Sequence, residues 1–210
     1  MEWDGKSLMF DTGGEGRRLL SHMEIMGKDP GQIDMVFLSH IHGDHTGGLE
    51  GLSMHNPRLE IYIPQSFPPG FDEATKRRGC VAVRISSPRE IFPGLFSTGE
   101  MGVWTKEQSL VVDVEGGAIV LTGCAHPGIV EVIKRAKAMI PGGIRLVMGG
   151  YHLFSTNQRE IIEVIEAFQE SGVEGVCPCH CTGEMAINLF RESYGEGYIA
   201  GGVGRVIGIV

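Results

Sequence analysis

Residues 40–45 read His40-Ile41-His42-Gly43-Asp44-His45 and closely follow an apolar run typical of a buried strand, Met35 to Leu38. The histidine and aspartate side chains in this stretch are ones that bind divalent metal ions. Alternate residues of extended backbone point the same way, so the first two histidines are placed to share one ion. The glycine permits a sharp turn that brings the aspartate and the last histidine towards a second ion. The stretch predicts a pair of metal ions in one cleft.

The alternative interpretation of this stretch is a solvated polar loop in which the histidines only cap neighbouring elements. We disfavour it because imidazoles and a carboxylate gathered between apolar segments are costly to keep unpaired. Metal binding removes that cost.

Apolar runs of strand length alternate with segments of helical period on both sides of this stretch, which indicates α/β layering. We expect strands at residues 7–10, 35–38, 59–63, 110–114, 118–122, 144–148, 173–177 and 205–210. We expect helices at residues 19–26, 129–140 and 157–171, and one that begins near residue 185. Residues 64–79 are rich in proline, glycine and charge and are expected to form a loop or lid that packs no core. Several of the strands end in short segments that carry His, Asp or Cys, which places the site at the carboxyl ends of the strands.

The composition limits the class of protein. The chain has 210 residues, of which 42% are hydrophobic and 21% charged, so we expect one folded domain over residues 1–210 rather than disorder. The net charge of -8 has the wrong sign for a protein that wraps nucleic acid. No apolar run reaches the roughly 20 residues that span a bilayer, and the first residues lack a secretory signal. We therefore expect a cytoplasmic protein without a nucleic-acid or membrane partner, whose five cysteines are free thiols.

Cys124 and His126 lie two residues apart at the end of an expected strand. If the chain stays extended there, both side chains face one cleft. We assign His126 as the third imidazole of the first ion, because that ion needs another ligand. Cys124 is either a small core residue or a metal ligand.

The segment Cys177-Pro178-Cys179-His180-Cys181 contains the next candidate ligand. Strand alternation would place the three thiols on one side and His180 on the other, so they should not serve the same ion. We assign His180 as a ligand and interpret the thiols as small packing residues beneath the site.

Two further residues have open roles. His152 is a candidate catalytic residue, but a substrate contact, an additional ligand and a structural histidine remain alternatives. Asp11 closes the first expected strand, where it either caps the following helix or orients a ligand histidine from behind.

These motifs together resemble the metallo-β-lactamase superfamily, whose signature is a strand-end aspartate, then His-x-His-x-Asp-His, then single later ligands. Residues 121–129, 149–153 and 178–183 are similar to one branch, which contains a pterin-pathway synthase and related metal-dependent hydrolases. The resemblance covers about residues 7 to 185. It implies a four-layer αβ/βα sandwich with a dinuclear metal site at one edge. It also implies that the ligands include His40, His42, Asp44, His45 and His180.

Three departures from the family pattern stand out. The chain begins almost at the Asp11 strand, so the opening strand is short or missing, and the sheet edge is exposed or paired with another copy. Glu100 stands where many members carry a Gly-His ligand motif, although His126 is the preferred ligand. Cys124 stands where many relatives carry a metal-bridging aspartate.

The function predicted from these residues is metal-dependent hydrolysis. Two divalent ions, zinc in the first place and otherwise iron, manganese or magnesium, would lower the pKa of a water molecule that attacks an ester or phosphoester. Asp44 and His152 are the predicted catalytic residues. The expected partner is a small-molecule substrate, with a phosphorylated compound as one option and a homo-oligomer as a further one.

Three alternatives belong to other classes. A pterin-pathway condensing enzyme would use the same ions to stabilise the departing charge of a phosphorylated substrate. A di-iron redox or sensing domain is disfavoured, because such members usually place glutamate where this chain has His42. A structural metal domain would hold its ions with closed coordination and without activity.

Overall fold

The computed structural model describes residues 1–208 and contains two β-sheets. The first sheet has the order β1-β2-β3-β4-β5. Its strands are β1 (Glu2–Trp3), β2 (Lys6–Phe10), β3 (Met35–Phe37), β4 (Glu60–Pro64) and β5 (Val81–Ile85). Strands β2 to β5 are parallel, and only the short β1 is antiparallel to its neighbour. Their carboxyl ends therefore meet at one edge.

The second sheet has the order β11-β10-β9-β8-β7-β6. Its strands are β6 (Arg89–Phe92), β7 (Leu95–Ser97), β8 (Leu110–Val114), β9 (Gly117–Thr122), β10 (Gly143–Gly150) and β11 (Val176–Cys179). Strands β6 to β9 are antiparallel, whereas β9, β10 and β11 are parallel. The predicted hairpin at residues 110–122 is the pair β8 and β9.

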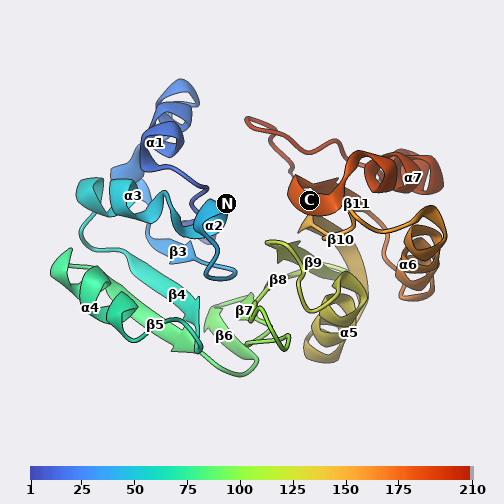
Figure 1. Cartoon of the computed structure of the whole chain (residues 1–210), viewed down its shortest axis with the longest axis horizontal. Helices are drawn as coiled ribbons and strands as arrows, with labels where there is room; N and C mark the ends of the chain where they lie inside the picture. Colours follow the sequence, from blue (N-terminus) through green and yellow to red (C-terminus); the bar gives the residue numbers. More distant parts are fainter. Residues whose placement is uncertain (209–210) are drawn as a thin grey trace.

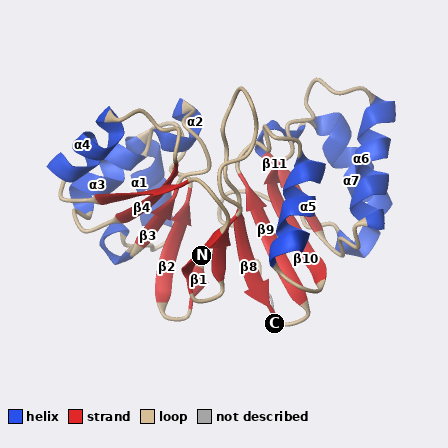
Figure 2. Cartoon of the chain, turned by 90° about the horizontal axis from the view of Figure 1, so that it is seen from below, coloured by secondary structure: helices blue, strands red, loops and turns tan. Residues whose placement is uncertain are grey.

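Within residues 1–208, seven α-helices flank the two sheets, and all but the four-residue α2 cover their outer faces (Figures 1 and 2). Beside the first sheet lie α1 (Gly16–Ile25), α2 (Gly43–Thr46), α3 (Leu49–His55) and α4 (Gly70–Arg77). Beside the second lie α5 (Ile129–Met139), α6 (Gln158–Glu170) and α7 (Glu184–Tyr194). Short 3-10 helices are η1 (Pro30–Gln32), η2 (His180–Thr182) and η3 (Gly195–Gly197). The arrangement is helix, sheet, sheet, helix, which confirms the predicted four-layer sandwich.

Strand alternation sorts the core into three layers. On β3, Val36 packs with the helices of the first half, whereas the next residue, Phe37, faces the other sheet. On β9, Val120 and Ile119 divide in the same way. Each fully buried side chain of this size contributes roughly 1.5–3 kcal/mol to folding. The layer between the sheets holds them together and fixes the strand ends that carry the candidate ligands.

The prediction that residues 64–79 form a loop or lid without core contacts is wrong. This segment contains α4, and Phe67 and Thr75 are buried. The Phe67 ring meets the Phe71 ring edge to face at 5.0 Å. The charged residues that suggested a loop occupy the outer side of a short amphipathic helix.

The two last expected strands also need correction. The strand predicted at 173–177 lies at Val176–Cys179, and Val173 makes only an isolated bridge to Ile144. Pro178 is accepted there because β11 is an edge strand. In the tail, residues 205–208 form no strand, and residues 209–210 of that prediction lie outside the described part of the chain. The glycines at 201, 202 and 204 weaken strand formation.

Among residues 1–208, no helix combines the length and the apolar character that crossing a membrane requires.

Candidate metal centre

Three histidines form the first set of candidate ligands. The donor nitrogens of His40, His42 and His126 all lie within 4.8 Å of one another. His40 is fully buried, and its Nε2 lies 3.0 Å from His42 Nδ1. His126 Nε2 is buried without a hydrogen-bond partner, which costs about 1–3 kcal/mol unless something binds it. A metal ion fits this set, because it would satisfy the unpaired nitrogen.

A second set combines a carboxylate with two imidazoles. Asp44 Oδ2 lies 3.3 Å from His45 Nε2 and 3.3 Å from His180 Nε2. His45 is buried, whereas the Asp44 side chain is 57% exposed and His180 is 40% exposed. This set therefore opens to solvent, while the first set lies deeper. The rings of His40 and His45 are 4.1 Å apart, so the two sets are neighbours.

Cys124 lies between the two sets. Its Sγ is 3.3 Å from His45 Nε2, and its donor atom is within 4.8 Å of that of His40. Cys124 is buried, yet it belongs to none of the three apolar clusters. Of the two interpretations drawn from the sequence, this position favours the ligand.

Asp11 orients the ligand histidine from behind. Its Oδ2 lies 2.6 Å from His45 Nδ1 and accepts a hydrogen bond from Ser39 Oγ, and its Oδ1 accepts from the Ser39 N–H. The residue before α1 is Glu15, so Asp11 is not the cap of that helix. With Nδ1 occupied by Asp11, the Nε2 of His45 is left facing Asp44.

Ser39 links the ligands, and no pattern in the sequence indicated this role. Its hydroxyl lies 2.9 Å from His40 Nδ1, and the same oxygen donates to Asp11. A Cβ on Gly123 would lie 2.1 Å from this hydroxyl oxygen, so only glycine fits there. The serine thereby holds His40 with Nε2 towards His42.

Glu107 is the second residue that the sequence analysis missed. It is 1% exposed, and its Oε1 accepts hydrogen bonds from the backbone N–H groups of residues 123, 124 and 125 at 2.9–3.1 Å. Its Oε2 accepts from the N–H of His126 at 2.9 Å. Burial raises the pKa of Glu107, against the lowering effect of these N–H groups. One carboxylate thus fixes the turn that carries Cys124 and His126.

Positive φ angles gather at the site. Five non-glycine residues of the described chain have them, and four belong to the site: Asp11, Ala125, His152 and His180. Such a conformation costs about 1–3 kcal/mol and persists only where the surroundings impose it. These strained conformations occur at the strand ends that carry the candidate ligands.

The surroundings of His40 and His126, two members of the first set, favour their neutral form. Burial, with the neighbouring histidines, lowers the pKa of His40 to about 2 and that of His126 to about 4. Burial also opposes the charged form of His45, but its hydrogen bond to Asp11 and the acidic neighbours outweigh this and raise the pKa. Neutral imidazole is the form that binds metal.

The remaining candidates divide into those near the site and those outside it. The His152 ring is 4.4 Å from the His126 ring, so it lies beside the first set. Cys177 is buried in the apolar layer between the sheets, as the packing interpretation predicted. For Cys181 that interpretation stays a prediction, and its Sγ lies within 4.8 Å of donor atoms of Cys124 and His152. The chain leaves the strand after Cys179 and enters η2, where alternation no longer applies. Glu100 accepts a hydrogen bond from the Ser66 N–H and joins no donor set.

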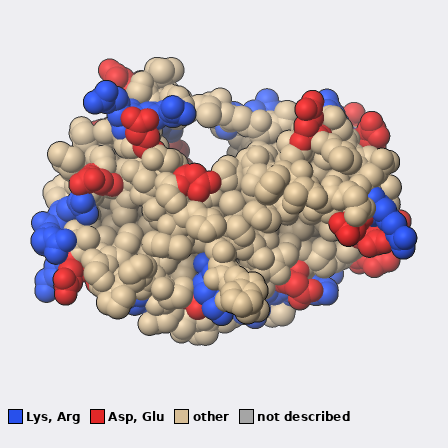
Figure 3. All heavy atoms as spheres, viewed as in Figure 1, with Lys and Arg blue, Asp and Glu red and all other residues tan. Residues whose placement is uncertain are grey.

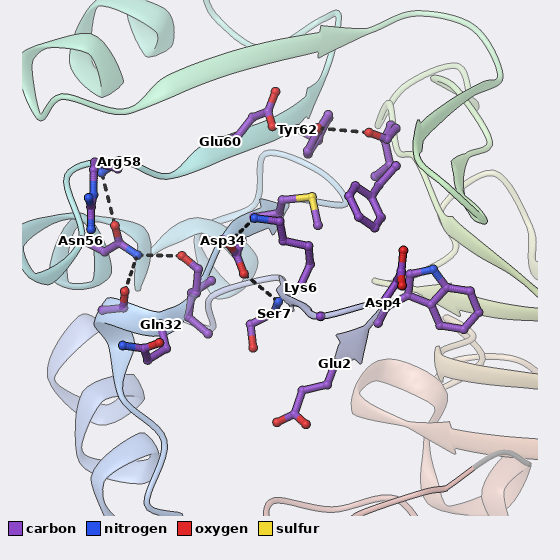
Figure 4. Close-up of a pocket in the computed structure, with 17 residues that line it drawn as sticks. Glu2, Asp4, Lys6, Ser7, Gln32, Asp34, Asn56, Arg58, Glu60 and Tyr62 are labelled. Carbon is purple, nitrogen blue, oxygen red and sulfur yellow. Dashed lines mark hydrogen bonds and ion pairs between the residues drawn. The ribbon is translucent and has the colours of Figure 1, made fainter.

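A hollow of about 1090 Å³ lies away from the candidate metal centre (Figure 4). It is lined by the amino-terminal ends of strands, including Lys6, Met35 and Glu60, so it is at the opposite edge of the first sheet. It contains none of the candidate ligands, and Lys6 is already paired with Asp34 at 2.8 Å. We place the functional site at the metal centre because the unpaired donors and the backbone strain are there.

The fold and the two donor sets define an α/β sandwich with a candidate metal centre, and comparison gives its family. Residues 2–142 match the model of the metallo-beta-lactamase superfamily, and the chain belongs to this superfamily.

Three relatives show how far the likeness extends. The chain is 29% identical to the 7,8-dihydropterin-6-methyl-4-(beta-D-ribofuranosyl)-aminobenzene-5'-phosphate synthase of Methanocaldococcus jannaschii, over 96% of this chain and 84% of the synthase. It is 24% identical to an uncharacterized protein of the same organism, over 100% of this chain and 91% of that protein. A crystal structure described as a metal-dependent hydrolase of the beta-lactamase superfamily superposes with a TM-score of 0.81 at 23% identity, covering 99% of this chain and 95% of the other.

Proposed function

We propose that this protein is a metal-dependent hydrolase that acts on an ester or phosphoester bond of a small molecule. The observation that carries the proposal is the pair of adjoining donor sets, one of three histidines and one of Asp44, His45 and His180. When bound there, two divalent ions supply an activated water and positive charge that stabilises an anionic transition state. Zinc is the preferred ion for imidazole, carboxylate and thiolate donors, with iron and manganese next, and magnesium fits least.

Residues of the chain would hold the ions, accept a proton and position the ligands. The Asp44 side chain is exposed, and its Oδ2 contacts both histidines of its set. We assign it to hold the second ion and to accept a proton from the attacking nucleophile through its other oxygen. Asp11 and Glu107 keep His45 and His126 in place. His152, beside His126 and with Nδ1 unpaired, stays a predicted catalytic residue.

The charge distribution argues against a nucleic-acid substrate and leaves a small molecule as the proposed substrate. The chain carries a net charge of -8. On the face seen in Figure 3, Lys and Arg side chains are scattered around the margin and interspersed with Asp and Glu, and they form no continuous basic stripe across the middle. A nucleic-acid backbone requires such a stripe, so we retain a small-molecule substrate.

The second candidate function is condensation. It is favoured by the likeness to the pterin-pathway synthase, which extends over 96% of the chain. In this alternative the same residues bind a phosphorylated substrate, and the metal centre stabilises the charge of its leaving group. The reaction then consumes a second organic substrate, whereas hydrolysis consumes only water.

Product analysis with the metal-loaded protein tests both functions. We expect turnover of p-nitrophenyl ester or phosphodiester probes that a chelator abolishes while the circular dichroism spectrum persists. The variant His180→Asn should lose activity by at least about a hundredfold, since it removes a ligand. His55→Asn is the matched control, because this exposed histidine bonds only the Gly51 carbonyl. If no probe is hydrolysed and a dihydropterin is joined to an aminobenzene compound, the hydrolase proposal fails in favour of condensation.

A further inference from the structure

Two thiols and an imidazole lie together beside the two sets described above. Cys124, His152 and Cys181 each stand two residues beyond the end of their strand, on β9, β10 and β11 respectively. These strands are parallel neighbours, with Gly149 in register with Thr122 and Gly150 with Cys179. The three donor atoms lie within 4.8 Å of one another.

The positions of the two thiols do not have a packing explanation. Cys80 and Cys177 belong to apolar clusters, whereas Cys124 and Cys181 belong to none. A Cβ at residue 150 would lie 2.4 Å from the Gly123 carbonyl oxygen and 2.7 Å from Cys181 Sγ, so the backbone of the neighbouring strand as well as the thiol requires glycine there. Two thiols that join no apolar cluster and converge with an imidazole point to a binding role.

The backbone around the cluster is fixed. Thr182 Oγ1 accepts from the Tyr151 N–H at 3.1 Å and donates to the Cys179 carbonyl at 2.6 Å, which ties β10 to the turn that holds Cys181. His152 has a φ of 55°, so its side chain is held in a strained conformation. Its Nδ1 is buried and has no hydrogen-bond partner. A nitrogen held this way beside two thiols is ready to bind a cation.

We propose that Cys124, His152 and Cys181 form a third metal site, selective for a thiophilic divalent ion such as zinc or cadmium. Two thiolates and an imidazole are donors that soft and borderline ions prefer. Binding would release the two thiol protons to solvent, and the two thiolates would balance the charge of the ion. Three protein ligands leave one coordination position open, as in catalytic zinc sites.

Cys181 separates this site from the dinuclear centre. Cys124 also approaches His45 at 3.3 Å, so it borders both. Cys181 belongs to neither histidine-rich set. The proposal therefore stands or falls on Cys181, and it is independent of whether the protein hydrolyses or condenses its substrate.

Titration of the metal-free protein with cobalt(II) tests the third site without an activity assay. We expect three bound ions per chain by elemental analysis and a thiolate-to-cobalt charge-transfer band in the near ultraviolet. In Cys181→Ser, we expect two bound ions and a band reduced by at least about half. Cys177→Ser, which alters a buried thiol on β11, the strand that leads to Cys181, should bind and absorb like the unaltered protein.

A second variant protects the test against misfolding. His152→Gln should also lose the third ion, and melting of each metal-free variant followed by circular dichroism shows whether it folds. The proposal is overturned if the unaltered protein binds only two ions, or if Cys181→Ser and His152→Gln both retain the third ion.

Discussion

Glu107 shows how a single buried carboxylate can order a metal-binding turn. Backbone N–H groups converge on both of its oxygens from consecutive residues 123 to 126. Charge-assisted bonds of this kind are about twice as strong as neutral ones. The two side chains carried by that turn, Cys124 and His126, therefore meet the first histidines at a fixed position.

We predict that Glu107→Gln weakens zinc binding by roughly 10- to 100-fold and destabilises the protein by about 1–3 kcal/mol. The amide group turns one acceptor into a donor, which then faces a backbone N–H. Zinc titration and chemical denaturation measure the two effects. Glu115→Gln, in the exposed turn of the β8–β9 hairpin, should change stability by less than about 0.5 kcal/mol. Equal zinc affinity in the two variants would contradict the role of Glu107.

The buried His40 gives a prediction about pH for the metal-free protein. Its pKa is about 2 in the folded state against 6.5 for an ordinary histidine, because burial and neighbouring histidines disfavour its charge. Above pH 6.5 neither state is protonated, and below it only the unfolded state takes up this proton. Stability should therefore fall with decreasing pH, by about 1.4 kcal/mol per pH unit for this one group.

Urea denaturation between pH 7.5 and 4.5 measures this slope. In His40→Asn the slope should be smaller by the equivalent of one proton, whereas His55→Asn should keep the slope of the unaltered protein. The raised pKa of His45 acts in the opposite direction, and His45 is present in the unaltered protein and in both variants. An unchanged slope in His40→Asn would show that His40 is not held neutral.

At this scale, the sequence predicted the residues whose chemistry is visible in side-chain spacing. His40, His42, Asp44 and His45 are adjacent in the chain, so their convergence needs only one turn. Glu107 was missed because its partners are backbone N–H groups, which leave no pattern in the side chains. For Cys181 the alternation argument reached past the end of its strand into η2, where side chains no longer alternate.

Close approaches between elements position the strand ends. Gly123 follows β9 and packs directly against Ser39, which follows β3 of the other sheet. This is a point where the two sheets touch at the metal centre. A side chain there would separate the segments that carry His40 and His126.

We therefore expect Gly123→Ala to destabilise the protein by about 2 kcal/mol or more and to weaken metal binding. The new Cβ would lie 2.1 Å from Ser39 Oγ and 3.2 Å from an Asp11 carboxylate oxygen, so both would have to move. Gly202→Ala is the matched control, because nothing lies within 4 Å of its Cβ position. Thermal denaturation and zinc titration distinguish them, and similar behaviour of the two variants would refute the argument.

The elements with a long and regular apolar pattern were the ones predicted accurately. The hairpin of β8 and β9 and the helices α5 and α6 were predicted within about two residues, since their apolar periods are long and regular. Strands β5 to β7 and helices α2 to α4 were not predicted. These elements are short, and partly exposed strands such as β6 have no clear alternation, so local sequence carries little signal.

At the scale of the whole molecule, the metal centre joins two halves. His40, His42, Asp44 and His45 follow the first sheet, whereas His126 and His180 follow the second. The set of three histidines and the set of Asp44, His45 and His180 thus each take ligands from both sheets. In Figure 1 the two sheets with their helices form the two sides of the molecule. An ion in either set would link those sides and would bind only the folded chain.

That linkage predicts a large stabilisation by metal. At a free zinc concentration 1,000 times the dissociation constant, one ion adds about 4 kcal/mol to the free energy of unfolding. For a chain of this length, this corresponds to a rise in Tm of roughly 8–16 °C, which a chelator should reverse. In His180→Asn the rise should shrink, because the second set loses its only ligand from the second sheet, while His55→Asn should respond like the unaltered protein. Thermal melts with zinc and with chelator measure the effect. If zinc leaves the Tm of the unaltered protein unchanged, the donors of the two sheets do not bind a common ion.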